Sequence, residues 1–228
     1  SRHLASITAT PSAIDALIEN KNAVKAPGGL IILSARAVNS LVGGVIKQSG
    51  TLSASTDDTV VVRKGGRIML SASAVTLSSG SRTVARGQDG GGAVEITASK
   101  TATVEATAKV SVSATENGNG GTIAIHADEK TTINGTLLAQ SGKASGNGGT
   151  ISTTSNGIVE IGATAEVKAG DRGVTPGQVG TWNVQSAKME INTNNAGVIS
   201  KAVNVANVNI KVTSQNATTT NVAGELQN

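Results

Sequence analysis

The sequence has no cysteine, no phenylalanine and no tyrosine, and its one aromatic ring is Trp182. The absence of cysteine excludes disulfide bonds, thiolate zinc sites and cysteine nucleophiles. The near absence of rings argues against a globular enzyme core, a nucleic-acid platform that stacks bases, and a membrane barrel with aromatic girdles. The apolar residues, 38% of the 228, are therefore almost all alanine, valine, isoleucine and leucine.

Long hydrophobic runs and strong charge are also missing. No stretch approaches the roughly 18 apolar residues of a membrane span, and the first ten residues, SRHLASITAT, lack the apolar segment of a signal peptide. If the protein is exported, we expect its targeting segment to lie outside this chain. The 19 basic and 15 acidic residues are scattered, which is typical of a solvated surface, so we expect no nucleic-acid partner.

Glycine is abundant, with 28 residues, and glycine pairs introduce a repeated segment. The copies are GGLIILS from Gly28, GGRIMLS from Gly65, GGAVEIT from Gly91, GGTIAIH from Gly120 and GGTISTT from Gly148, with VGTWNVQ from Val179 as a variant. Counted from the residue after the second glycine, they begin at 30, 67, 93, 122, 150 and 181, so the spacings are 37, 26, 29, 28 and 31 residues. A period near 28 with variable insertions is the signature of a solenoid.

Alternation within the aligned copies predicts which side chains are buried, because successive residues of a strand point to opposite faces. Two columns are apolar almost throughout, and we predict that they form the core. The first contains Ile31, Ile68, Val94, Ile123, Ile151 and Trp182, and the second contains Leu33, Leu70, Ile96, Ile125, Thr153 and Val184. The columns beside them are mostly polar or small and should face solvent.

Each repeat also contains a second and a third piece that favours a β-strand, such as ATVEA from Ala102 and KVSVSA from Lys109. Three short strands joined by glycine, serine and asparagine turns make one coil, and equivalent strands of successive coils stack in parallel. We therefore predict an all-β fold, a parallel β-helix with a period of about 28 residues. A narrow core of this kind explains the missing aromatic residues, since large rings would spread neighbouring coils.

Three segments depart from the strand pattern and are predicted to be short helices. They are PSAIDALIENK from Pro11, SARAVNSLVGGV from Ser34 and ISKAVNVAN from Ile199. The chain accordingly divides into an N-terminal segment with a short helix (1–27), β-helix repeats (28–184), and C-terminal coils with the last helical candidate (185–228). Such inserts can shield strand edges. Because the ends show no obvious polar cap, we expect a piece of a longer rod.

Three stretches resemble a known family. They are LIENKNAVKAPGGLIILSARAVNSLVGGVIKQSGTLSAS from Leu17, NGTLLAQSGKASGNGGTI from Asn134 and PGQVGTWNVQSAKMEI from Pro176. They are similar to the exoproteins of two-partner secretion in Gram-negative bacteria, the filamentous-haemagglutinin-like or TpsA proteins. The resemblance covers roughly residues 10 to 228.

The resemblance implies a right-handed, secreted β-helix that reaches the bacterial cell surface through an outer-membrane transporter. It implies adhesion to host cells, other bacteria or matrix polysaccharide, with surface glycans or proteins as partners and with lateral or end-to-end self-association. The NPNL and NPNG-type motifs of the family's secretion domain do not occur here, so the chain would be stalk, and the transporter would be engaged by a domain that this chain lacks. Capture of a host haem carrier and a stalk for a contact-dependent toxin are alternatives within the same family.

The sequence offers little chemistry for catalysis or cofactors. His126 lies on an outward column between Thr97 and Thr154, so it has no second metal ligand of its own kind beside it. Glu95 and Glu160 lie on outward columns. Only Glu95 and Glu105 share a turn, and nothing in the pattern brings these two together as a carboxylate pair. We expect no enzyme activity, no catalytic residue, no cofactor and no metal site, and a polysaccharide-degrading β-helix enzyme is the disfavoured alternative.

Two Asn-x-Thr sequons are candidate glycosylation sites, at Asn134 and Asn216. The first is also an Asn-Gly pair, which is a strong turn signal in its own right. One branch of the family that the chain resembles, the high-molecular-weight adhesins, is glycosylated at such sequons.

Overall fold

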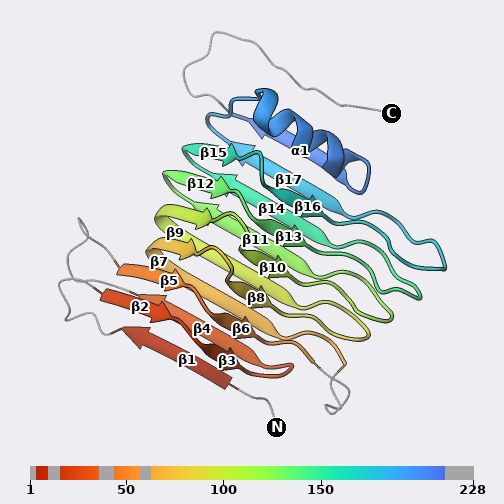
Figure 1. The fold of residues 1–228 in the computed structure, drawn as a ribbon, viewed down its shortest axis with the longest axis horizontal. Coiled ribbons are helices and arrows are strands. Elements are labelled where there is room, and N and C mark those ends of the chain that lie inside the picture. The colour runs from red at the N-terminus through yellow and green to blue at the C-terminus, as the bar shows by residue number, and fades with distance from the viewer. Residues whose placement is uncertain (1–3, 10–15, 36–43, 57–62, 214–228) are drawn as a thin grey trace.

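The chain winds into a stack of similar coils, in which equivalent strands of successive coils lie side by side (Figure 1). The structure is a computed structural model that describes residues 4–9, 16–35, 44–56 and 63–213. Its strands form one sheet of 12 strands and another of 6, and neighbouring strands run parallel. The predicted parallel β-helix, with a period of about 28 residues, is confirmed.

Each coil uses three strand positions. The first position is occupied by β1 (Leu4–Ala9), β4 (Leu30–Ala35), β7 (Arg67–Leu77), β9 (Ala93–Val104), β11 (Thr122–Ala127), β14 (Thr150–Ser155), β17 (Thr181–Ser186) and β18 (Asn207–Val212). The second contains β2 (Ala16–Asn20), β5 (Gly44–Gln48), β12 (Lys130–Ile133) and β15 (Ile158–Ile161). The third contains β3 (Ala23–Lys25), β6 (Thr51–Ser53), β8 (Arg82–Val84), β10 (Lys109–Ser111), β13 (Thr136–Leu138) and β16 (Glu166–Lys168). In β7 and β9 the first and second positions merge into one long strand.

The register of the first-position strands follows the glycine repeats residue by residue. Thr122 pairs with Ala93 on one side and with Thr150 on the other. The two apolar columns thereby stack without a shift, and every one of their members is at most 2% exposed. Backbone ladders and a continuous aliphatic core therefore run together along the stack.

The single aromatic residue fits this narrow core because its neighbour is polar and small. Trp182 is fully buried, and its indole N–H donates a hydrogen bond to Thr153 Oγ1 in the preceding coil at 3.1 Å. Thr153 is the one polar residue in the second core column. A hydroxyl there satisfies the indole N–H, which burial would otherwise leave without a partner.

The paired glycines are required where the coils approach most closely. A Cβ placed on Gly121 would lie 2.0 Å from Gly92 O, and one placed on Gly92 would lie 2.1 Å from Gly66 O. Backbone therefore packs directly on backbone at the start of β7, β9, β11, β14 and β17. This contact explains why glycine introduces the repeat.

Of the three predicted helices, one was wrong, one lies mostly outside the described residues, and one is present. In the first candidate, residues 11–15 lie outside the described residues, and residues 16–20 form β2, because Leu17 and Ile18 pair with Val45 and Ile46 of the next coil and this pairing overrides the helical spacing. In the second candidate, residues 36–43 are not described, and the chain on either side is in β4 and β5. The third overlaps α1 (Thr193–Val203), which begins earlier than predicted.

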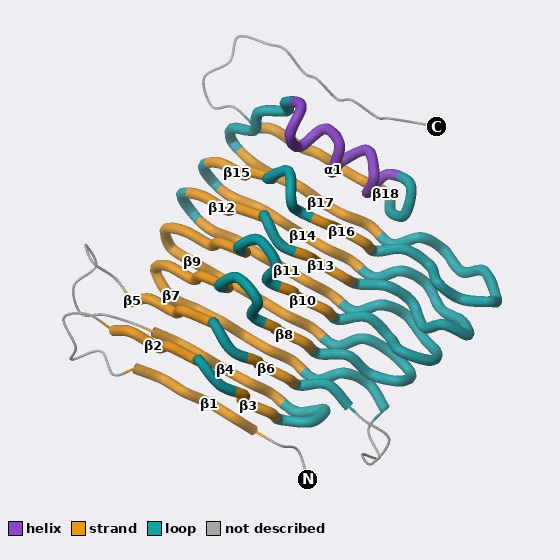
Figure 2. Tube along the Cα trace, viewed as in Figure 1, coloured by secondary structure: helices purple, strands orange, loops and turns teal. Residues whose placement is uncertain are grey.

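Helix α1 lies at the C-terminal end of the stack, against the coils rather than within them (Figure 2). Its contacts are mainly with β16 and β18. Val198, Ile199 and Ala202 are buried, so the helix covers apolar surface at this end. No helix in the described ranges has the length and apolar character needed to cross a membrane.

Candidate functional site

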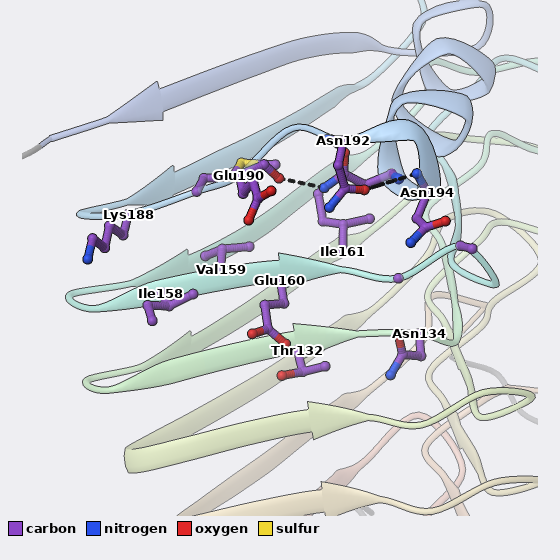
Figure 3. A pocket seen from close by; sticks show the side chains of 14 residues that line it. Thr132, Asn134, Ile158, Val159, Glu160, Ile161, Lys188, Glu190, Asn192 and Asn194 are labelled. Carbon is purple, nitrogen blue, oxygen red and sulfur yellow. Dashed lines mark hydrogen bonds between the residues drawn. The ribbon is translucent and has the colours of Figure 1, made fainter.

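A groove lies beside β15, close to the start of α1 (Figure 3). After β17 the chain makes one bridge to the second-position strand, between Lys188 and Ile158, and then leaves the sheet to form the helix. A cavity of about 640 Å³ opens where the next second-position strand would have stacked. Its walls are Thr132, Asn134, residues 158–163 and 188–190, Asn192, Asn194 and Asn195.

The wall on the helix side is fixed by a network of amide groups. Asn192 Oδ1 accepts hydrogen bonds from the backbone N–H groups of Asn194, at 2.9 Å, and Asn195, at 3.3 Å. Asn195 Oδ1 accepts from Asn192 N at 2.9 Å, which completes a capping box, and Asn195 Nδ2 donates to Glu190 O at 2.7 Å. The helix start and the segment that carries Glu190 are thus locked together.

The floor of the groove is a strand edge with free main-chain groups. In a parallel ladder, the main-chain groups of alternate residues point to the strands on opposite sides. Those of Glu160 and Gly162 point to β12, whereas those of Val159 and Ile161 point to the side that lacks a complete strand. Val159 N–H is taken by Ser186 Oγ at 3.0 Å and by Lys188 O at 3.4 Å. In the described part of the chain, the N–H and C=O of Ile161 have no hydrogen-bond partner on that side.

Two carboxylates and several neutral polar groups line the same groove. Glu160 lies beside Thr132 in the outward column and forms an ion pair with Lys130 at 2.8 Å. Glu190 enters from the opposite wall, and its side chain has no partner among the residues that the structure describes (Figure 3). Sequence reasoning placed Glu160 outward but missed Glu190, because Glu190 lies where the chain leaves the repeat and no column contains it.

Asn134, the first candidate glycosylation site, lies in the turn between β12 and β13 and lines this groove. Its backbone N–H donates to Val104 O at 2.8 Å, and its carbonyl accepts from Thr164 Oγ1 at 2.8 Å. Its side chain packs beneath Gly162, where an added Cβ would lie 1.8 Å from Asn134 Oδ1. The second candidate, Asn216, lies outside the described residues.

His126 joins a chain of polar groups across two coils. Its Nδ1 lies 2.9 Å from Thr154 Oγ1 and its Nε2 lies 3.3 Å from Asp128 Oδ1, which also accepts from Asn156 Nδ2 at 2.7 Å. A hydroxyl, an imidazole and a carboxylate in series occur in hydrolases, but such sites also need N–H groups directed at an oxyanion. Here the N–H groups of β11 and β14 are committed to the parallel ladder, so the cluster joins adjacent coils.

A second polar cluster fixes the loop before β17. Asp171 accepts hydrogen bonds from Gly173 N at 2.7 Å, Gly177 N at 2.6 Å and Ser141 Oγ at 2.9 Å. These bonds, the one from Gly173 most of all, lower the pKa of Asp171. Arg172 reaches across two coils to Ser141 O and Ala114 O, and burial, with a smaller effect of Arg86, lowers its pKa. Both side chains are engaged in holding the loop.

The remaining chemistry is sparse, and the comparisons with known proteins add no assignment. Within residues 4–9, 16–35, 44–56 and 63–213, no three histidine or acidic side chains come together in a way that could hold a metal ion. No known family model matches the sequence, and no curated protein matches it. The groove beside β15 combines a cavity, an unpaired strand edge and polar side chains in one place.

Proposed function

We propose that the chain is the stalk of a secreted bacterial surface adhesin, the β-helical part of a two-partner secretion exoprotein that attaches its cell to host cells, bacteria or matrix polysaccharide. The observation that carries the proposal is the uninterrupted first-position ladder, which runs from β1 to β18. The resemblance of the sequence to that family supplies the location and the partners, including an outer-membrane transporter engaged by another domain.

A stack of this kind suits a mechanical role. Up to the coil of β14, β15 and β16, each coil is joined to the next by ladder hydrogen bonds at all three strand positions and by two columns of aliphatic side chains. At about 4.8 Å per coil, the seven steps from β1 to β18 span roughly 34 Å. The stack is therefore a stiff spacer that can hold a binding surface away from a cell.

The outward faces suit weak, repeated contacts. One outward column of the first-position strands presents Thr122, Thr150 and Thr181 one above another. Short hydroxyl and amide side chains hydrogen-bond to sugars or to main chain but bury little area, so each contact is weak. Many copies on one surface would convert such contacts into firm attachment through avidity.

The test is attachment by the folded chain. Beads that carry the purified protein are presented to bacterial cells, epithelial cells and an array of glycans, after far-UV circular dichroism has established β structure. We expect specific, saturable attachment that excess soluble protein removes. Folded protein that attaches to none of these surfaces would contradict adhesion by this stretch.

A further inference from the structure

We infer that the groove beside β15 binds a short stretch of a neutral, hydroxyl-rich saccharide. The inference rests on the proposed function, because it names the ligand class and the place for the proposed attachment. It follows from the free strand edge, the size of the cavity and the chemistry of the groups that line it.

The edge of β15 that faces the groove is not paired with a complete strand. The second-position strand β12 is paired on both sides, by β9 and by β15, whereas Ile161 of β15 turns an N–H and a C=O into the groove without a partner in the described chain. A sugar hydroxyl both donates and accepts hydrogen bonds, so one hydroxyl pair can satisfy both groups. A cavity of about 640 Å³ lies within the range of small-ligand sites, and is large enough for two or three sugar rings.

The side chains that line the groove offer hydrogen-bond acceptors and carry both signs of charge. Glu160 and Glu190 supply carboxylate oxygens from opposite walls, and Asn134, Asn194 and Thr132 add neutral groups that both donate and accept (Figure 3). Among the lining residues the only cation is Lys188. Carboxylates accept strongly from hydroxyls. Lys130 balances the charge of Glu160, but Glu190 has no cationic partner in the described chain and repels other anions, so the groove favours neutral sugars over uronates and sulfated chains.

The lining of the groove also sets the strength of binding. Ile158 is 39% exposed and Met189 is partly buried, so the groove offers aliphatic patches but no ring on which a sugar could stack. We therefore expect dissociation constants of about a millimolar for one site, in keeping with a site that works in many copies.

The experiment measures binding of named saccharides to the whole chain by saturation-transfer NMR. The probes are maltotriose, mannotriose and chitotriose triacetate as neutral chains, with trigalacturonic acid as the anionic match. The test variant is E190Q with N194A, and the matched control is E95Q, whose glutamate forms an ion pair with Arg67 on a different face. We expect at least one neutral trisaccharide to bind, the test variant to weaken binding about tenfold, and E95Q to bind as the parent chain does.

Three results would overturn the inference: no neutral trisaccharide binds, trigalacturonic acid binds better, or E95Q loses as much affinity as the test variant. Binding of an extended peptide of alternating lysine and valine, with no saccharide binding, would also overturn it and would indicate strand addition at β15. If cell attachment survives in the test variant, the proposed function stands and only the role of the groove is rejected. If a saccharide binds in the groove but the chain attaches to no cell, the saccharide site stands and the proposed function is rejected.

Discussion

The regular coils and the last coil differ at the second strand position, which is a full strand in the regular coils and a single bridge in the last one. In the regular coils, from β4 to β14, every strand is followed by an equivalent strand one coil later, whereas β15 and β16 are followed by none. In the last coil, residues 170–213, the chain makes a single bridge at Lys188, leaves the sheet and forms α1. The repeat therefore builds the rod, and the departure from the repeat builds the groove.

The N-terminal end shows what the stack looks like without such a departure. There β1, β2 and β3 each pair with one neighbour only. Ile7, which continues the second core column below Leu33, is 44% exposed, and Leu17 is 62% exposed. At the other end, α1 buries apolar side chains over the third-position strands. An open strand edge can pair with another chain, and α1 covers such an edge beside β16.

The largest effect is expected for a charge placed in a regular core column. Ile123 is fully buried between Val94 and Ile151, so I123D should destabilise the fold by more than about 4 kcal/mol, because the carboxylate would have no partner. The control is T122D, whose side chain points outward next to it. Thermal unfolding followed by circular dichroism checks the pair, and an unchanged melting curve for I123D would contradict the stacking.

A charge in the last coil should cost less and act locally. Ile199 on α1 is buried against the end of the stack, and I199D should destabilise by about 2–4 kcal/mol, since the carboxylate can reach water as the helix lifts. Hydrogen exchange should rise in β16 while β11 stays protected, and light scattering should detect end-to-end oligomers. The exposed neighbour variant S200D is the control. Equal loss of protection in β11 would show that the two regions unfold as one.

Replacing glycine by alanine should change the free energy of unfolding in opposite directions in the two regions. G121A forces a Cβ against Gly92 O and should destabilise by about 1–3 kcal/mol. G197A lies in α1 with nothing within 4 Å of the new Cβ, and should stabilise the helix by about 1 kcal/mol. Urea denaturation of the two variants and the parent chain measures both. Two changes of the same sign would mean that close backbone contact does not explain the glycine repeat.

The sequence predicts the regular coils well because several independent patterns indicate the position of each residue there. Ile123, for example, is placed by its own alternation, by the glycine pair before it and by the matching residues one period away. The last coil has no such redundancy, so the N-cap at Asn192 and the position of Glu190 were not predicted. Residues 16–20 failed for a related reason, since their spacing suits a helix and only pairing with the next coil makes them a strand.

The smallest effect concerns the loop that leads into the last coil. Backbone hydrogen bonds lower the pKa of Asp171 in the folded chain below that of the unfolded chain, so its stabilising effect is present above the unfolded pKa and is lost as the pH falls through the folded one. Below about pH 4 the amide protons of Gly173 and Gly177 should therefore lose protection relative to their intrinsic exchange rates at the same pH, while those in the turns of regular coils keep theirs. The D171N variant, which cannot ionise, should show fast exchange at every pH. If both chains show the same pH profile, the carboxylate does not hold this loop, and the contrast between the last coil and the regular ones rests on α1 alone.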